Sequence, residues 1–278
     1  MPFTFFAHQV PVLPLKLARP RWFDGTALCI GSMAPDLGYP IEPWVSHNTH
    51  TALGIVTWGA GFTFVACFAI RRWVASTTFA QLPDAGRFRL HSLRALATRR
   101  PAAWITVMSA IVGAASHVVV DAFTHEHRFA ARWFGFDHVA FTTSRGPVTI
   151  ARLLQNGGHT IGTLVGLGLL AHIGRTRRLE QWYGTATVRD CRSFTLTQAQ
   201  RVRFWSIVAF AVVAGLVWSL MRSALGVFEL IDATALGVVI ASALPACRPK
   251  PGYGADAPRI ELAVTGGRHV GAADRHGS

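Results

Sequence analysis

Five stretches of the chain are apolar over about the length of a membrane-crossing helix, with polar or charged segments between most of them. A helix needs about 20 apolar residues to cross roughly 30 Å of hydrocarbon. The pattern therefore predicts an all-α fold, a polytopic membrane bundle of about five transmembrane helices. The predicted spans are residues 51–70, 103–122, 157–174, 204–225 and 228–244, of which 157–174 is the least apolar.

The two ends of the chain have a different character. Residues 1–50 contain seven prolines, which rule out a straight helix of span length and predict short interfacial or re-entrant helices. The tail is rich in Gly, Pro and Arg and is predicted to be disordered. The predicted organisation is an N-terminal interfacial segment that contributes site residues (1–50), a membrane helical domain (51–245) and a cytoplasmic tail (246–278).

Charge sharpens this interpretation. The chain carries 27 Lys and Arg against 14 Asp and Glu, which could indicate nucleic-acid binding, but it is 51% hydrophobic and only 15% charged. Nineteen of the basic residues fall in 71–102, in 175–203 and in the tail from residue 248, as expected for cytoplasmic loops. We therefore expect a multi-pass protein of the inner (cytoplasmic) membrane, with membrane lipids and no nucleic acid as partners and the N-terminal fifty residues outside.

The stretch ASHVVVDAFTHEH, residues 115–127, places ionisable side chains at the end of the second apolar run. On a helix His117, Asp121 and His125 are spaced i, i+4 and i+8 and project from one face. Such groups are costly inside a span unless they face a cavity, a partner or an ion. Imidazole and carboxylate without thiolate suit zinc, manganese or iron. The alternative is that His117 and Asp121 only hydrogen-bond each other.

The expected topology brings further ligand candidates to the same, outer face. His117, Asp121 and His125 form a ladder along the helix, each about 6 Å further along the axis than the last. Two of these residues must therefore share each ion with residues from elsewhere. The N-terminal segment offers both histidine and carboxylate on that side. Its candidates are His8, Asp36, His47 and His50, of which His47 is either a ligand or an interfacial residue.

Other polar residues are weaker candidates. Glu126, His127, Asp137 and His138 belong to the outer loop and are expected to be solvated, and His159 could support the ligands. Glu229 and Asp232 suit a helix-capping role. The histidines expected on the cytoplasmic side are excluded from the site: His91, His172, His269 and His276.

Four segments resemble a known family. Together they look like an uncharacterised family of bacterial membrane proteins, a domain of unknown function. That family is related to predicted membrane-bound metal-dependent hydrolases. The four segments are MPFTFFAHQVPVLPL, IGSMAPDLGYP, SHNTHTALGI and GAASHVVVDAFTHEH. More remotely, the helical H-x-x-x-D with a further histidine is similar to the zinc-dependent phospholipase C and P1 nuclease group. The resemblance implies a divalent metal, zinc first, held by His8, Asp36, His50, His117, Asp121 and His125.

The expected function is a membrane-bound, metal-dependent hydrolase acting on a phosphoester or lipid headgroup at the extracytoplasmic face. Asp36 or Asp121 would serve as the catalytic base. Two alternatives stay open: a metal-binding or transport protein, and a non-catalytic membrane component whose polar cluster is structural. The sequence lacks GxGxxG after a strand, GxxxxGK[ST], HExxH and GxSxG, so nucleotide-driven, zincin and serine-esterase chemistry lose their main support.

Overall fold

The structure is a computed structural model that describes residues 4–41, 48–84, 86–144, 146–221 and 227–251. The described chain is mostly helical, with two small antiparallel pairs of strands, so the all-α expectation holds in its coarse form. The strands are β1 (Val139–Thr143) with β2 (Gly146–Thr149), and β3 (Phe194–Thr195) with β4 (Lys250–Pro251).

In the described part of the Pro-rich N-terminal segment the helices are short, as its prolines predicted. They are α1 (Thr4–Gln9), α2 (Leu13–Ala18), α3 (Gly25–Gly31) and a 3₁₀ turn over Asp36–Ile41. Proline at the start of α2 lacks only an amide that would be unpaired there in any case. Asp24 caps α3 by accepting hydrogen bonds from the amides of Thr26 and Ala27. His47 lies outside the described residues.

Among the described residues, three helices, and not five, are long and apolar enough to cross a membrane. They are the helical stretches Ala52–Gln81, Ala103–Trp133 and Gln198–Met221. The first contains α4 (Ala52–Gly54), α5 (Ala60–Ala69) and α6 (Ala75–Gln81), joined by the π-helical turns Ile55–Gly59 and Ile70–Val74. The second contains α7 (Ala103–Thr124) and α8 (Phe129–Trp133), and the third is α12 (Gln198–Met221).

The two other predicted spans are helical but do not qualify. Residues 157–174 belong to α9 (Ile150–Arg175), which is long enough but not among the apolar candidates because glycine and polar residues dilute its hydropathy. Residues 228–244 fall in α13 (Val227–Ala243), whose 17 residues are too few. The expectation of five spans was therefore wrong in number.

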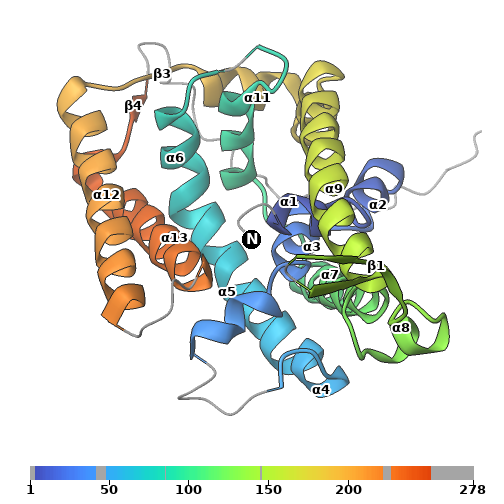
Figure 1. The fold of residues 1–278 in the computed structure, drawn as a ribbon. Coiled ribbons are helices and arrows are strands. Elements are labelled where there is room, and N and C mark those ends of the chain that lie inside the picture. The colour runs from blue at the N-terminus through green and yellow to red at the C-terminus, as the bar shows by residue number, and fades with distance from the viewer. Residues whose placement is uncertain (1–3, 42–47, 85, 145, 222–226, 252–278) are drawn as a thin grey trace, which may run out of the picture.

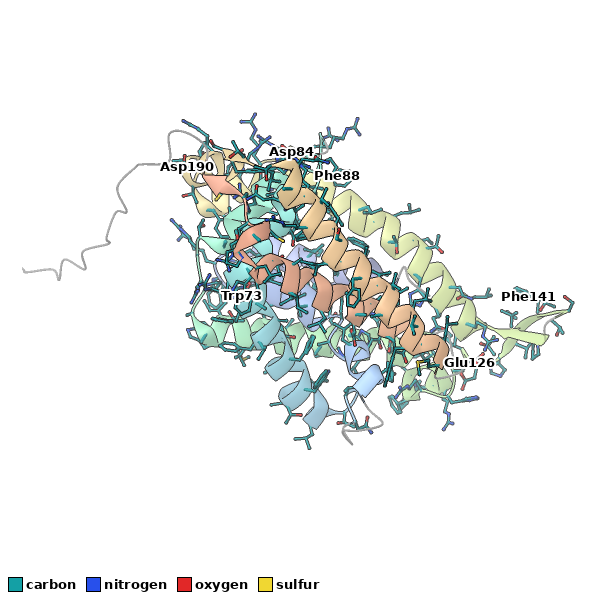
Figure 2. All side chains as sticks on the ribbon, turned by 90° about the vertical axis from the view of Figure 1, so that its left-hand side faces the viewer. Trp73, Asp84, Phe88, Glu126, Phe141 and Asp190 are labelled. Atoms are coloured by element: carbon teal, nitrogen blue, oxygen red, sulfur yellow. The ribbon has the colours of Figure 1, made fainter. Side chains whose placement is uncertain are left out.

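Smaller helices connect these elements. They are a 3₁₀ helix over Leu90–Ala97, α10 (Arg178–Tyr183), α11 (Thr185–Arg192) and a 3₁₀ turn over Pro245–Cys247. Figure 1 shows α12 and α13 as a hairpin on one side of the long α5–α6 helix, and α9 with α1 on the other. The labelled residues Asp84, Phe88 and Asp190 lie at one end of the molecule, and Glu126 and Phe141 lie at the opposite end (Figure 2).

Glycines bring α3 and α7 into backbone contact. A Cβ at Gly113 of α7 would lie 2.6 Å from the Leu28 carbonyl oxygen and 2.8 Å from the Ser32 amide nitrogen. A Cβ at Gly31 of α3 would lie 2.5 Å from the Ala110 carbonyl oxygen. Such approaches are closer than any side chain allows, so these glycines place the end of α3 directly on α7.

A buried ion pair ties the same region to the first apolar helix. Asp24, at the start of α3, pairs with Arg71 and accepts a hydrogen bond from the Thr106 hydroxyl at 2.8 Å. Its amide donates to the Ser109 hydroxyl at 2.9 Å. Arg71 therefore lies within a helix, and not in a solvated loop as the sequence suggested, because the Asp24 carboxylate compensates its buried charge.

Candidate metal centre

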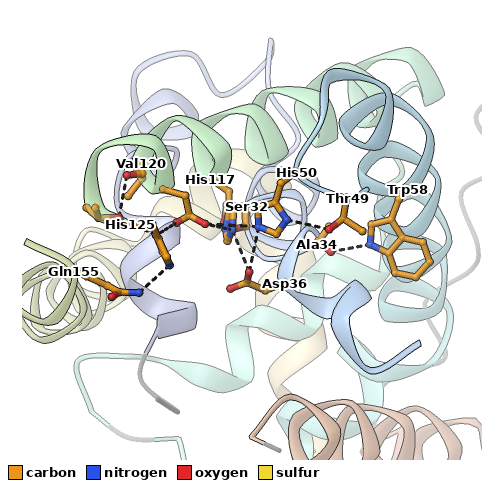
Figure 3. Close-up of polar contacts among 12 residues, drawn as sticks. Ser32, Ala34, Asp36, Thr49, His50, Trp58, His117, Val120, His125 and Gln155 are labelled. Atoms are coloured by element: carbon orange, nitrogen blue, oxygen red, sulfur yellow. Dashed lines mark hydrogen bonds and ion pairs between the residues drawn. The ribbon is translucent and has the colours of Figure 1, made fainter. Parts of the chain in front are cut away.

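Four side chains from three segments converge at the α3–α7 junction. Asp36 comes from the 3₁₀ turn, His50 from the residues just before α4, and His117 and Asp121 from α7 (Figure 3). One ligand atom from each lies within 4.8 Å of all the others. This group could hold a metal ion.

The individual distances are those of ligands around a single ion. His117 Nε2 lies 3.3 Å from Asp36 Oδ1 and 3.2 Å from Asp121 Oδ2. His50 Nε2 lies 3.5 Å and 3.6 Å from the same two oxygens. Ligands bound tetrahedrally at about 2 Å are separated by roughly 3.3 Å, which matches this spacing.

The group is largely shielded from solvent. The side chains of His117, His50 and Asp121 are 0%, 6% and 8% exposed, and that of Asp36 is 14% exposed. Unpaired charges at such depth cost several kcal/mol. Asp36 is the most accessible of the four.

Backbone geometry positions His117 and determines which ring nitrogen is free. The Ser32 carbonyl lies 2.9 Å from His117 Nδ1 and can only accept, so Nδ1 carries the proton and donates. In the neutral ring Nε2 then has a lone pair, directed at two carboxylate oxygens. That nitrogen is buried and has no hydrogen-bond partner. A lone pair facing two carboxylates is repelled unless a cation lies between them or Nε2 takes up a proton and forms ion pairs with them.

His50 is held in a similar way. Thr51 caps α4 by accepting from the Gly54 amide at 3.1 Å. Because Gly54 has no Cβ, the Asn48 carbonyl can pack against this turn, where a Cβ would lie only 2.1 Å away. The Thr49 hydroxyl lies 3.0 Å from His50 Nδ1, and His50 Nε2 is buried without a hydrogen-bond partner. Contacts on the second nitrogen are typical of metal-binding histidines.

His125 does not continue the helical ladder. The chain leaves the helix after Thr124, and His125 is extended, with φ −105° and ψ 136°. Its Nδ1 lies 3.5 Å from Asp121 Oδ1, and its Nε2 lies 2.8 Å from the Gln155 side-chain nitrogen (Figure 3). The helical placement was wrong because α7 ends one residue earlier. His125 therefore approaches Asp121 from outside the group of four.

His8, in α1, lies beside His117. It is buried, and its ring stacks on that of His117 with centroids 4.2 Å apart and an interplanar angle of 29°. Burial lowers the pKa of His8 to about 4. His8 is therefore neutral at physiological pH. Whether it binds the ion directly stays a prediction.

The weaker candidates mostly make local contacts elsewhere. Asp137 accepts a hydrogen bond from the His127 amide at 3.0 Å, and Glu126 accepts one from the Thr149 hydroxyl at 2.7 Å. His159 approaches His8, with ring centroids 6.1 Å apart. His91 pairs with Asp84, at the end of the molecule far from Glu126.

Sequence reasoning missed the supporting residues. Ser32 acts through its backbone carbonyl and Gln155 through a contact across 30 residues, and neither has a motif. The GxxxH spacing of Gly113 and His117 was the available signal, because a glycine four residues before a buried ligand marks a close backbone approach.

Metal affinity is expected to fall as the pH is lowered from about 8 to about 6. Burial favours the neutral His50 ring, but the facing carboxylates of Asp121 and Asp36 outweigh burial and raise its pKa. A proton on His50 must therefore leave before Nε2 can bind an ion, so affinity rises with pH. Competition with a chromophoric chelator would measure this slope. His172→Ala, which removes an exposed histidine, should leave the slope unchanged. An affinity constant across the range would contradict the assignment of His50.

The helices and the buried group together define a class: a helical protein with candidate membrane spans and a possible metal site of two histidines and two aspartates. The chain belongs to the family described as Domain of unknown function (DUF4184), whose sequence profile matches residues 1–247. No curated protein and no solved structure matches the chain.

Proposed function

We propose that this protein is a membrane-bound, metal-dependent hydrolase that cleaves a phosphoester, with a lipid headgroup as its substrate. One observation carries the proposal: the Nε2 atoms of His50 and His117, both buried and unpartnered, point at the same two carboxylate oxygens. Structural zinc sites are usually rich in cysteine, whereas imidazole and carboxylate ligands are typical of catalytic ones. The resemblance to the zinc-dependent phospholipase C and P1 nuclease motifs supports the same reaction class.

A bound divalent ion, zinc first, would acidify a water molecule and polarise a phosphoryl oxygen. The chain supplies the geometry for this chemistry. The Ser32 carbonyl and the Thr49 hydroxyl orient the two imidazoles, and His125 orients Asp121. Burial opposes ionisation of Asp36, yet the rings of His117 and His50 hold its pKa well below the usual range. Asp36 is the more accessible carboxylate, so we assign it the role of accepting the proton from the attacking water.

We infer that the protein is a multi-pass protein of the inner membrane and that the site faces outward. Asp121 lies one turn from the end of α7, near Glu126, at the end of the molecule opposite Asp84 and Asp190. Asp84, Phe88 and Asp190 come from the basic segments of the chain and lie at that opposite end. Positive charge favours the cytoplasmic side. The tail beyond residue 251 lies outside the described residues.

Chelator-sensitive phosphoester hydrolysis is the direct test. The purified protein, loaded with zinc or manganese, should hydrolyse bis-p-nitrophenyl phosphate or a phospholipid, and EDTA should abolish the activity. Asp36→Asn should lower the turnover per bound metal by about 10²–10⁴, the usual contribution of a general base. His172→Ala, at an exposed position of α9, is the matched control. Stoichiometric metal without any chelator-sensitive hydrolysis would favour the rival function, metal binding or transport.

A further inference from the structure

An open groove lined by apolar residues runs between α1 and α9. Its volume is about 660 Å³, within the range of small-molecule sites. Its walls are aliphatic: Val10 and Pro11 follow α1, and Leu153, Leu154 and Ile161 belong to α9. Leu153, Leu154 and Ile161 are 40%, 40% and 65% exposed.

Glycines create the groove. Gly157 and Gly158 line it, and a Cβ at either position would meet nothing within 4 Å. One turn further along α9, Gly162 lets α1 approach so closely that a Cβ there would lie 2.7 Å from that of Ala7. The glycines thus bring α1 and α9 into close contact at Gly162 and leave the groove open beside that contact.

The groove leads toward the metal centre. A chamber of about 60 Å³ shares Ala7, Leu154 and Gly158 with the groove and adds the polar side chains of His8, Gln155 and His159. His8 stacks on His117, and Gln155 contacts His125, which faces Asp121. One continuous surface therefore passes from apolar to polar beside the candidate ligands.

We propose that this groove holds the alkyl chain of an amphiphilic phosphoester, with the headgroup at the metal centre. The inference rests on the proposed function and specifies its substrate class. An apolar wall suits a methylene chain, and an anionic phosphate complements a bound divalent cation. An apolar face of a second copy of the chain would meet the polar side chains of His8, Gln155 and His159 at the end of the groove, whereas an amphiphile directs its polar end toward them.

The glycines also provide a test that leaves the fold intact. Gly158→Leu places a side chain in the groove, and a Cβ at this position of α9 meets nothing within 4 Å. Gly168→Leu is the control: it adds the same side chain to the same helix, also without a clash, but outside the groove. The probe is lysophosphatidic acid with a diazirine in its chain, photocrosslinked to the full-length protein in phosphatidylcholine nanodiscs and mapped by peptide mass spectrometry. Adducts should concentrate on residues 150–165 and fall at least fivefold in Gly158→Leu, but not in Gly168→Leu.

Competition by soluble alkyl phosphates adds a second measurement. Dodecyl phosphate should suppress labelling and butyl phosphate should not, because each buried methylene contributes about fourfold in affinity. Labelling spread evenly over α9, α12 and α13, labelling unchanged in Gly158→Leu, or crosslinked dimers in place of lipid adducts would overturn the inference. Groove labelling in a metal-loaded protein without hydrolase activity would instead reject the proposed function and leave the groove assignment standing.

Discussion

His117→Ala and Asp121→Asn are each expected to weaken zinc binding by well over tenfold. Loss of a residue that only hydrogen-bonds a metal ligand already weakens binding by about tenfold or more. Each replacement removes one of the four atoms that converge within 4.8 Å, and the remaining three leave an ion incompletely coordinated. His117→Ala also deprives the Ser32 carbonyl of its donor. Chelator competition, with metal content measured by elemental analysis, would give the affinities.

The control for this pair is His172→Ala, which removes an exposed histidine from α9 and should leave the affinity unchanged. Equal losses in His172→Ala and His117→Ala would show that the bound metal is not at the α3–α7 junction. Unchanged metal content in both His117→Ala and Asp121→Asn would support the structural alternative, in which the polar cluster holds no ion.

Gly113→Ala is expected to lower both the thermal stability and the metal affinity, although it adds only one methyl group. The new Cβ would lie 2.6 Å from the Leu28 carbonyl oxygen and 2.8 Å from the Ser32 amide, both backbone atoms. Helix α3 must then move away from α7, which carries Ser32 away from His117 and displaces Asp36. Overpacking typically costs about 1–3 kcal/mol, and we expect the upper end because no flexible side chain can yield.

Gly61→Ala is the matched control in the first apolar helix. A Cβ at Gly61 meets nothing within 4 Å, so the substitution should stabilise the helix by up to about 1 kcal/mol and leave metal binding unchanged. Thermal unfolding in detergent with and without zinc would separate the two effects. A Gly113→Ala variant as stable as Gly61→Ala, with normal metal affinity, would contradict the close α3–α7 contact.

Local periodicity made several features predictable. A run of apolar residues is sufficient to predict helices at 103–122 and 204–225, because a buried or lipid-facing helix needs little else. The spacing of His117 and Asp121 put both on one helix face, and prolines limited the N-terminal segment to short helices. The number of spans was harder to predict from the apolar runs. Helices α9 and α13 are helical, as expected, but α9 is not apolar enough and α13 is not long enough for a membrane helix.

Other features depended on contacts between distant segments. The sequence determined the helical character, the apolar runs and the pairing of His117 with Asp121, because these depend on residues a few positions apart. Only the tertiary structure decided that Asp36 and His50 meet this pair, that His125 lies beyond the helix end, and that His8 stacks on His117. The reason is physical: the approach of α3 to α7 depends on two glycines that match across the interface, and no local pattern specifies which backbone each will contact.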